Sequence, residues 1–295
     1  APPTQLQRWD DIVAQTPPMP GEPSRSANDL AMLMYTSGST GQPKGVMHNF
    51  GRIADVAKGI FDFLEKDQGA GKAHRMLSYL PLAHVFERAF VESVALYSGQ
   101  IQVFFAEALD TFVMDLQRAR PTIFISVPRL WLKFQQGVFG KMPPAKLNLL
   151  LSIPLLGGVV RKKILKGLGL DHVILAGSGS APIPAELIVW YRKLGLNLLE
   201  GYAMTEDFAY SHNSTTQINA PGCVGVPLEG VQAKISPEGE ILVKSPGQMV
   251  GYYKRPDLDA ESFTADGFFK TGDQGSQRAD GLLKITGRVK ELFKT

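Results

Sequence analysis

The stretch that decides the fold of this sequence is Tyr35-Thr36-Ser37-Gly38-Ser39-Thr40-Gly41-Gln42-Pro43-Lys44-Gly45-Val46. It follows an apolar segment, 31–35, that is predicted to be a buried strand. Three glycines let a backbone approach an anion closely, the hydroxyls add hydrogen-bond donors, and Lys44 adds a positive charge. The stretch therefore predicts a phosphate-binding loop. It lacks the Gly-Lys-Ser/Thr ending of a Walker A sequence, which argues against a P-loop nucleoside triphosphatase.

Around this loop, short apolar segments alternate with helical patterns. Strands are predicted over 31–35, 76–80, 101–105, 122–127, 172–176 and 197–199. A helix is predicted between the first two, because Ile53, Val56, Ala57, Ile60, Phe61 and Leu64 fall on one helical face. Another helix begins near Ala185 and ends before Gly195. Such alternation is typical of an α/β fold with a largely parallel, helix-covered sheet whose ligands bind at the carboxyl ends of the strands.

After residue 210 the helical spacing gives way to short strands separated by Gly and Pro. Segments 231–235 and 240–244 flank Ser236-Pro237-Glu238-Gly239, which suits a type I turn, and 282–286 is a further strand candidate. This region predicts a small antiparallel, β-barrel-like subdomain. We expect an irregular lead-in (1–30), an α/β subdomain (31–210) and a β-rich subdomain (211–287).

Composition argues against several classes of protein. The 31 basic and 28 acidic side chains are too balanced for a nucleic-acid-binding protein. The single cysteine, Cys223, excludes an internal disulfide, favours a reducing compartment and is interpreted as a small buried residue rather than a nucleophile. No signal-peptide pattern and no apolar run of membrane-spanning length is present. We therefore expect a cytoplasmic protein.

The most apolar segment, 147–160, allows two interpretations. It contains Pro154, Gly157 and Gly158 and continues into the basic residues Arg161, Lys162, Lys163 and Lys166. The favoured interpretation is a partly buried helix pair with a solvated basic edge. The second is peripheral contact with an anionic surface at the inner face of the membrane.

The loop at 35–46 resembles the signature of the adenylate-forming superfamily, which includes acyl-CoA synthetases, luciferases and peptide-synthetase adenylation domains. Further segments resemble this family's motifs in the family's order: 78–88, 122–130, 177–182, 200–206, 267–273 and 287–291. These matches run from Tyr35 to Lys290, nearly the whole chain. The chain is therefore identified as a member of the family. Its sequences at 80–88 and 177–182 are similar to those of bacterial long-chain fatty-acid–CoA ligases.

The resemblance implies a nucleotide site. In the family the first loop holds the phosphates of ATP, which implies that role for Thr36, Ser37, Gly38, Ser39, Thr40, Gly41 and Lys44. One wall of the adenine pocket would be formed by Gly179, Ser180, Ala181 and Pro182. The block Glu200-Gly201-Tyr202-Ala203-Met204-Thr205-Glu206 resembles the family's Tyr-Gly-x-Thr-Glu, with the tyrosine and the small residue permuted. Tyr202 would stack on adenine and Thr205 would bind phosphate.

The remaining roles are also implied by resemblance. Glu206, with Thr36, would hold Mg²⁺, and Asp207 is the alternative ligand. Asp273 would accept hydrogen bonds from the ribose hydroxyls, and Arg288 would contact ribose or phosphate. His84 follows a strand end and would lie beside the acyl carboxylate, although a lone histidine is more often structural. The catalytic set implied is Thr36, Lys44, His84 and Glu206.

The activity implied is ATP-dependent activation of a long-chain fatty acid to an acyl-adenylate, followed by transfer to coenzyme A with release of AMP. Alternatives are a fatty-acyl-AMP ligase, another carboxylic-acid adenylating enzyme, or a non-catalytic nucleotide-binding fragment. In the family, a hinge (here 288–295, with Lys290 as pivot) leads to a C-terminal lobe that carries a lysine needed for adenylation. No segment here matches that lobe, so we expect the chain alone to bind nucleotide but to turn over poorly.

Overall fold

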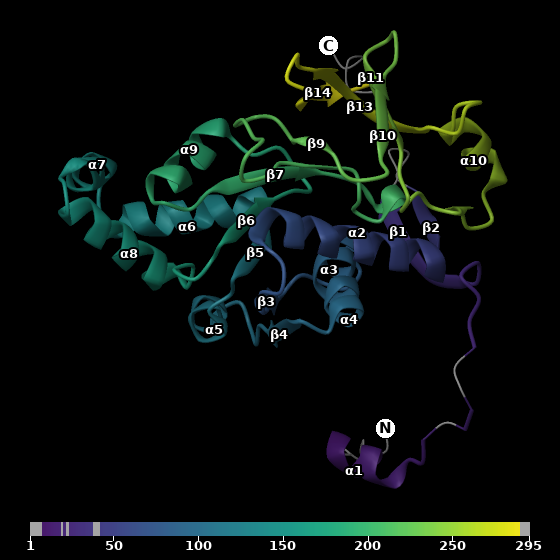
Figure 1. Cartoon of the computed structure of the whole chain (residues 1–295), viewed down its shortest axis with the longest axis horizontal. Coiled ribbons are helices and arrows are strands. Elements are labelled where there is room, and N and C mark those ends of the chain that lie inside the picture. The colour runs from purple at the N-terminus through teal and green to yellow at the C-terminus, as the bar shows by residue number, and fades with distance from the viewer. Residues whose placement is uncertain (1–7, 19, 22–23, 38–41, 290–295) are drawn as a thin grey trace.

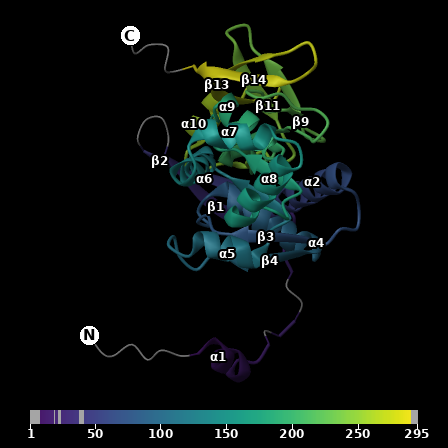
Figure 2. The ribbon, with the colours of Figure 1, turned by 90° about the vertical axis from the view of Figure 1, so that its left-hand side faces the viewer.

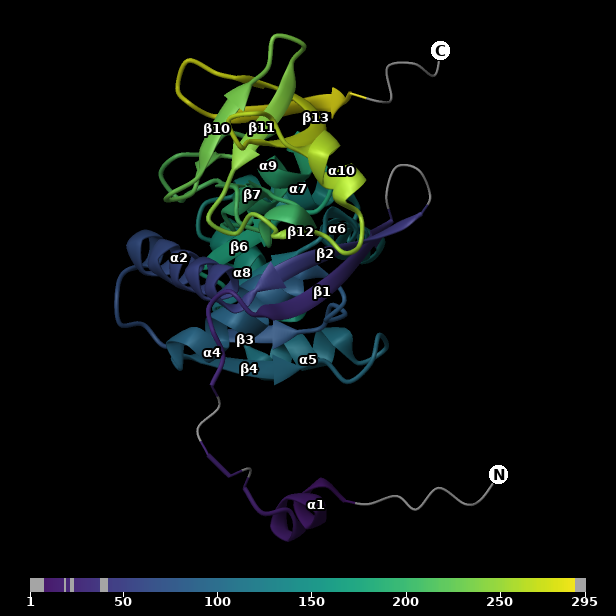
Figure 3. The ribbon, with the colours of Figure 1, turned by 90° about the vertical axis from the view of Figure 1, so that its right-hand side faces the viewer.

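The computed structural model describes residues 8–18, 20–21, 24–37 and 42–289, and its fold is shown in Figure 1. Several sheets with covering helices form an α/β body, and a curled antiparallel sheet lies at the top of the view. The predicted α/β class is thus confirmed. A short helix near the N-terminus, α1 (Trp9–Gln15), lies apart from this body in all three views (Figures 1, 2 and 3).

The stretch around the phosphate loop is an antiparallel hairpin rather than a strand followed by a loop. Strand β1 (Leu30–Ser37) pairs with β2 (Pro43–Asn49), and the two-residue strand β12 (Gly251–Tyr252) pairs with the other edge of β2. Strand β1 was predicted, whereas β2 was not, because the Pro-Lys-Gly start of β2 gives no alternating apolar pattern. Residues 38–41 at the tip lie outside the described residues.

The first long helix, α2 (Phe50–Gln68), follows the prediction. Asn49 caps it by accepting a hydrogen bond at 2.9 Å from the backbone N–H of Arg52. Its predicted inner face is buried, including Val56, Ala57, Ile60 and Leu64. The helix thereby anchors the hairpin to the body of the molecule.

Two parallel sheets carry the centre of the fold. One pairs β3 (His74–Ser78) with β4 (Ile101–Phe105). The chain between them forms α3 (Val85–Glu87), a π-helical turn (Arg88–Ser93) and α4 (Val94–Ser98). The other orders β5 (Ile123–Ser126), β6 (Leu175–Ser178) and β7 (Leu198–Tyr202) in parallel, then β8 (His212–Asn213) and β9 (Val226–Pro227) antiparallel.

The strand predicted over 172–176 begins three residues later, at Leu175. The preceding residues form a turn in which the N–H of Val173 donates to the carbonyl of Leu170 at 3.2 Å. This shift moves the end of β6 to Ser178, so that the following Gly-Ser pair lies at the edge of the sheet.

Five helices connect and cover these strands: α5 (Phe112–Ala119), α6 (Pro128–Lys141), α7 (Pro144–Ser152), α8 (Leu156–Leu168) and α9 (Ala185–Lys193). Leu187, Ile188 and Tyr191 of α9 are buried, and Gly195 follows the helix with a φ of +90°. Segment 147–160 is a helix pair, as the favoured interpretation held. Within the described residues, no helix combines the length and the apolar character needed to cross a membrane.

The C-terminal sheet has the order β10-β11-β13-β14, formed by Gln232–Ile235, Glu240–Lys244, Phe269–Gln277 and Leu283–Arg288. The helix α10 (Pro256–Ser262) precedes β13. The predicted turn is confirmed, because the N–H of Gly239 donates to the carbonyl of Ser236 at 2.9 Å. The strand expected at 282–286 is β14.

Candidate functional site

The carboxyl ends of β6 and β7 meet at one edge of the parallel sheet, where Ser178 pairs with Glu200. Buried aromatic side chains fix this edge. The indole Nε1 of Trp131 donates to the carbonyl of Gly177 at 3.2 Å, and the hydroxyl of Tyr191 donates to the carbonyl of Trp131 at 2.6 Å. These two hydrogen bonds therefore fix the backbone that leads into the predicted adenine wall.

A pocket of about 60 Å³ opens at this edge. Four predicted site residues line it: Gly179, Ser180, Gly201 and Tyr202. The rest of its wall is mostly apolar and comes from Val85, Phe86, Phe90, Ile125, Leu175, Ala209 and Leu228. Its lining residues include no aspartate, glutamate, lysine or arginine. His212 also lines it, and burial lowers the pKa of this histidine to about 4, so its ring is neutral near pH 7.

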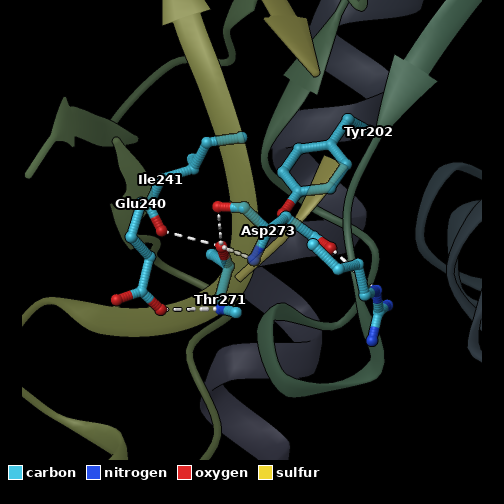
Figure 4. A network of polar contacts seen from close by, with 7 residues as sticks. Tyr202, Glu240, Ile241, Thr271 and Asp273 are labelled. Atoms are coloured by element: carbon cyan, nitrogen blue, oxygen red, sulfur yellow. Dashed lines mark hydrogen bonds and ion pairs between the residues drawn. The ribbon is translucent and has the colours of Figure 1, made fainter. Parts of the chain in front are cut away.

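Tyr202, which lines this pocket, points toward Asp273 of the C-terminal sheet (Figure 4). Its hydroxyl donates to Oδ2 of Asp273 at 2.7 Å, and Nε of Arg288 lies 3.0 Å from Oδ1 of the same carboxylate. Asp273 and Arg288 are register partners on β13 and β14. Burial, followed by the charge of Asp273, raises the pKa of Tyr202 well above its ordinary value, so the phenol stays protonated and donates. The structure thus brings together three predicted site residues from separate motifs.

The turn before Asp273 is tied to β11. The hydroxyl of Thr271 donates to the carbonyl of Ile241 at 2.7 Å, and the N–H of Gly272 donates to Oε1 of Glu240 at 2.8 Å (Figure 4). The N–H of Asp273 donates in turn to the Thr271 hydroxyl at 3.1 Å. These contacts set the direction in which the Asp273 carboxylate points.

A second group of side chains joins the hairpin to the turn Thr205–Asp207. The ammonium of Lys44 lies 5.1 Å from the centre of the Tyr252 ring, and the Tyr252 hydroxyl donates to Oε1 of Glu206 at 2.9 Å. Thr36 is the register partner of Lys44, and Ser37 pairs with Pro43. Lys44 and Glu206 are thus linked through one aromatic ring.

Sequence reasoning missed Tyr252. It stands in no motif, and its two partners lie far away along the chain, so no local pattern could have identified it.

The backbone of this turn is held on both sides. Nε2 of His48 lies 2.8 Å from the carbonyl of Thr205, and the N–H of Met249 donates to the carbonyl of Glu206 at 2.7 Å. His48 is completely buried, and burial lowers its pKa to about 4, so the neutral ring donates from Nε2. This histidine was also missed, because a single buried His has no sequence signal.

Asp207 is buried within its own turn. Its Oδ1 accepts hydrogen bonds from the N–H groups of Met204 at 2.9 Å and Tyr210 at 3.3 Å. Burial raises its pKa to about 8, and the negative charge of Glu206 adds to this shift. Of the two acids, Glu206 is the one whose carboxylate accepts a hydrogen bond from Tyr252, the residue that also contacts Lys44.

Glu200 and His84 lie outside the pocket wall as the structure describes it. Oε2 of Glu200 accepts a hydrogen bond from the N–H of Gly222 at 2.8 Å, and burial raises its pKa to about 7. Nδ1 of His84 accepts from the N–H of Phe86 at 3.3 Å and caps α3. Both side chains hold the fold locally, while Val85 and Phe86, next to His84, line the pocket.

Other predicted site residues lie outside the pocket wall or outside the described residues. Ala181 and Pro182 follow the pocket wall and are exposed. Gly38, Ser39, Thr40, Gly41 and the hinge residue Lys290 lie outside the described residues. In the part that the structure describes, no group of three or more His, Cys, Asp or Glu is arranged to hold a metal ion. A metal at Glu206 would therefore depend mainly on ligands other than carboxylates of the protein.

Comparison with known proteins identifies a family. Residues 2–253 match the family model described as "AMP-binding enzyme". Long chain acyl-CoA synthetase 5 of Arabidopsis thaliana is 30% identical over 328 residues, which covers 98% of this chain and 49% of that protein. Long-chain-fatty-acid–CoA ligase 6 of Rattus norvegicus is 33% identical over 306 residues, covering 94% and 43% respectively. The chain spans about half the length of these relatives.

The fold is likewise similar to solved structures. The crystal structure of ATP-bound MatB from Rhodopseudomonas palustris superposes with a TM-score of 0.74 at 28% identity. The match covers 95% of this chain and 52% of MatB. Sequence and structure comparisons therefore agree over nearly the whole chain.

Proposed function

Because this chain belongs to the AMP-binding enzymes, a family of adenylate-forming acyl-CoA ligases, we propose that it forms the adenylate-binding core of a long-chain fatty-acid–CoA ligase. The carboxylate of the acid attacks the α-phosphate of ATP, and pyrophosphate leaves. The thiol of coenzyme A then attacks the acyl carbon of the adenylate and releases AMP. Catalysis of the first step rests on positioning and on neutralising phosphate charge.

The nucleoside binds at the Tyr202–Asp273–Arg288 group. The Tyr202 ring packs on adenine beside the small residues of the Gly179 wall, which leave room for a flat ring. Asp273 accepts the ribose hydroxyls, since an ionised carboxylate has lone pairs beyond those used by Tyr202 and Arg288. Arg288 and Tyr202 hold the carboxylate in one orientation.

The phosphates bind between the hairpin and the turn Thr205–Asp207. Lys44 offsets their charge, and the hydroxyls of Thr36 and Thr205 donate hydrogen bonds to them. Mg²⁺ fits here, because it is commonly held by one or two carboxylates together with phosphates and water, and Glu206 supplies one partly buried carboxylate. When bound, the ion neutralises charge on the leaving phosphates.

The observation that supports a fatty acid as substrate is the uncharged pocket beside Gly179 and Tyr202. An amino acid would bring an ammonium group that needs a carboxylate partner, and the pocket lining has none. A second pocket of about 260 Å³ shares the wall residues Asn213 and Leu228 with the first. Asp62, Lys66, Asp67 and Glu229 form part of its lining, and Phe63, Ile218 and Leu228 form an apolar part. We place the start of the acyl chain in the first pocket and its continuation, past Leu228, along this apolar part of the second.

The test is the affinity of the chain for palmitoyl- and octanoyl-sulfamoyl-adenosine, which requires no turnover, in the wild type and in Leu228→Trp. Leu228 is buried in the shared wall, so a larger side chain should block the passage for the long acyl chain but leave the short one unaffected. We expect the preference for palmitoyl over octanoyl to reverse. An equal loss for both compounds would contradict the proposed path. Binding of aminoacyl but not fatty-acyl compounds would refute the substrate class.

A further inference from the structure

The helix pair α7–α8 exposes an unusual amount of apolar surface. Leu149, Leu155 and Val159 are 64%, 92% and 63% exposed, and Ile153 and Leu156 are exposed beside them. We call these five residues the apolar tip. The pair lies at the left end of the molecule's longest axis in Figure 1 and faces the viewer in Figure 2. Contiguous exposed apolar residues of this kind mark an interaction site.

The backbone at Leu155 adds a second observation. This residue has φ of 65° and ψ of −50°, and the N–H of Leu156 donates to the carbonyl of Pro154 at 2.7 Å. That arrangement is a γ-turn with positive φ, which is strained for a leucine and would be easy for a glycine. The side chain of Leu155 packs against almost nothing, since it is 92% exposed. Folding alone therefore gives no reason for a leucine here.

Basic side chains continue from the apolar tip along α8. Leu155, Val159, Lys162, Lys163 and Lys166 follow the helical spacing that places residues on one face. The opposite face packs inward, through Val160, Ile164 and Leu168 against the main core. The outward face thus combines an apolar end with a cationic continuation.

The charge of this region is strongly one-sided. Residues 116–170 contain ten of the chain's 31 basic side chains and none of its 28 acidic ones. Outside this stretch the chain is therefore net acidic, although its total charge is +3. An anionic surface would be attracted to this end of the molecule and repelled by the remainder, which orients the approach.

We propose that the α7–α8 pair docks on an anionic lipid bilayer. The apolar tip enters the boundary between headgroups and acyl chains, and Lys162, Lys163 and Lys166 bind lipid phosphates and carboxylates. A nucleic acid is the poorer fit, because the tip is aliphatic and offers no aromatic ring for stacking on bases. The docking does not rest on the proposed function, since its readout is binding to vesicles.

The experiment is co-sedimentation of the protein with two kinds of vesicle, phosphatidylcholine alone and phosphatidylcholine mixed with phosphatidylserine. We expect binding to the mixed vesicles that weakens with added salt. Lys162→Gln and Lys163→Gln should each weaken it about fivefold. Leu155→Gln should weaken it roughly tenfold or more, because the leucine side chain that would be buried in the bilayer is lost.

Matched controls keep the test decisive. Leu109 is 91% exposed and Lys284 is exposed, and both lie outside residues 116–170, so Leu109→Gln and Lys284→Gln should leave vesicle binding unchanged. Circular dichroism confirms that each variant is folded. Equal losses in control and tip variants would overturn the proposal, as would a folded wild type that binds neither vesicle. Stronger binding to duplex DNA than to the mixed vesicles, or Leu155-dependent self-association without vesicle binding, would assign the surface to another partner.

Discussion

The hydroxyl of Tyr252 donates a hydrogen bond to Oε1 of Glu206, while the face of the same ring lies 5.1 Å from the Lys44 ammonium. One buried tyrosine therefore contacts both Glu206 and Lys44, the two charged residues that we place around the phosphates of ATP. Because Tyr252 belongs to β12, which pairs with β2, its position depends on the hairpin that carries the glycine-rich loop.

Tyr252→Phe should weaken magnesium-dependent ATP binding about fivefold, because the variant removes one hydrogen bond to a charged group and keeps the ring. Isothermal titration with ATP in the presence and absence of Mg²⁺ measures this effect. Tyr253→Phe is the matched control, since this neighbour is exposed. A loss that is the same without Mg²⁺ would argue against an orienting role toward Glu206.

Tyr202→Phe should weaken AMP binding by roughly fivefold, because Asp273 loses the donor that fixes one of its oxygens while the aromatic ring remains. Tyr202→Ala should weaken it much further, since the stacking surface is lost as well. Titration of both variants with AMP separates the two contributions. Equal affinities of the two variants would contradict the placement of adenine on this ring.

Gly225→Ala should prevent stable folding. Gly225 has a φ of +90°, and an added Cβ would lie 2.0 Å from the backbone of Asn213 in the pocket wall. Gly222→Ala is the control, because Gly222 has a similar φ of +82° but open space around it, so about 1 kcal/mol is expected. Urea unfolding of both variants measures the difference, and similar midpoints would show that the close approach is wrong.

The free energy of unfolding should fall as the pH rises from about 6.5 to 8. Burial raises the pKa of Asp207 to about 8, from an ordinary value of 3.8, so the folded state holds a proton that the unfolded state has released. Glu200 contributes in the same direction up to about pH 7. The buried His48 and His212, with pKa values near 4, act in the opposite direction below pH 6.5 and do not affect this window.

Urea unfolding at several pH values checks this expectation. Asp207→Asn should flatten the slope, and Asp110→Asn, at an exposed position, should leave it unchanged. A slope that persists in Asp207→Asn would assign the proton to another group.

Much of this fold could be predicted because its signals are local. The buried stripe of α2 and the Pro-Gly turn at 236–239 follow from residue spacing alone. The resemblance to the adenylate-forming family also implied that Tyr202, Asp273 and Arg288 contact one nucleotide, and the Tyr202–Asp273 contact spans 71 residues.

The remaining features depend on contacts between distant segments. His48 lies 157 residues from Thr205, and nothing in its sequence surroundings indicates burial against that turn. The resemblance implied a site role for Glu200 and His84, and the structure shows that each accepts a hydrogen bond from a backbone N–H, that of Gly222 and that of Phe86 respectively. The direction of a side chain is set by such competing donors, and spacing does not reveal them.

The most direct test of the account is the affinity of the chain for non-hydrolysable acyl-sulfamoyl-adenosines, from acetyl to palmitoyl, with circular dichroism confirming a folded protein. These compounds occupy the nucleoside site and the acyl pocket together and require no turnover. We predict that affinity rises with acyl length and that Leu228→Trp abolishes the rise. An affinity independent of acyl length would contradict a long-chain pocket beside Tyr202, and no binding by a folded chain would contradict the adenylate site itself.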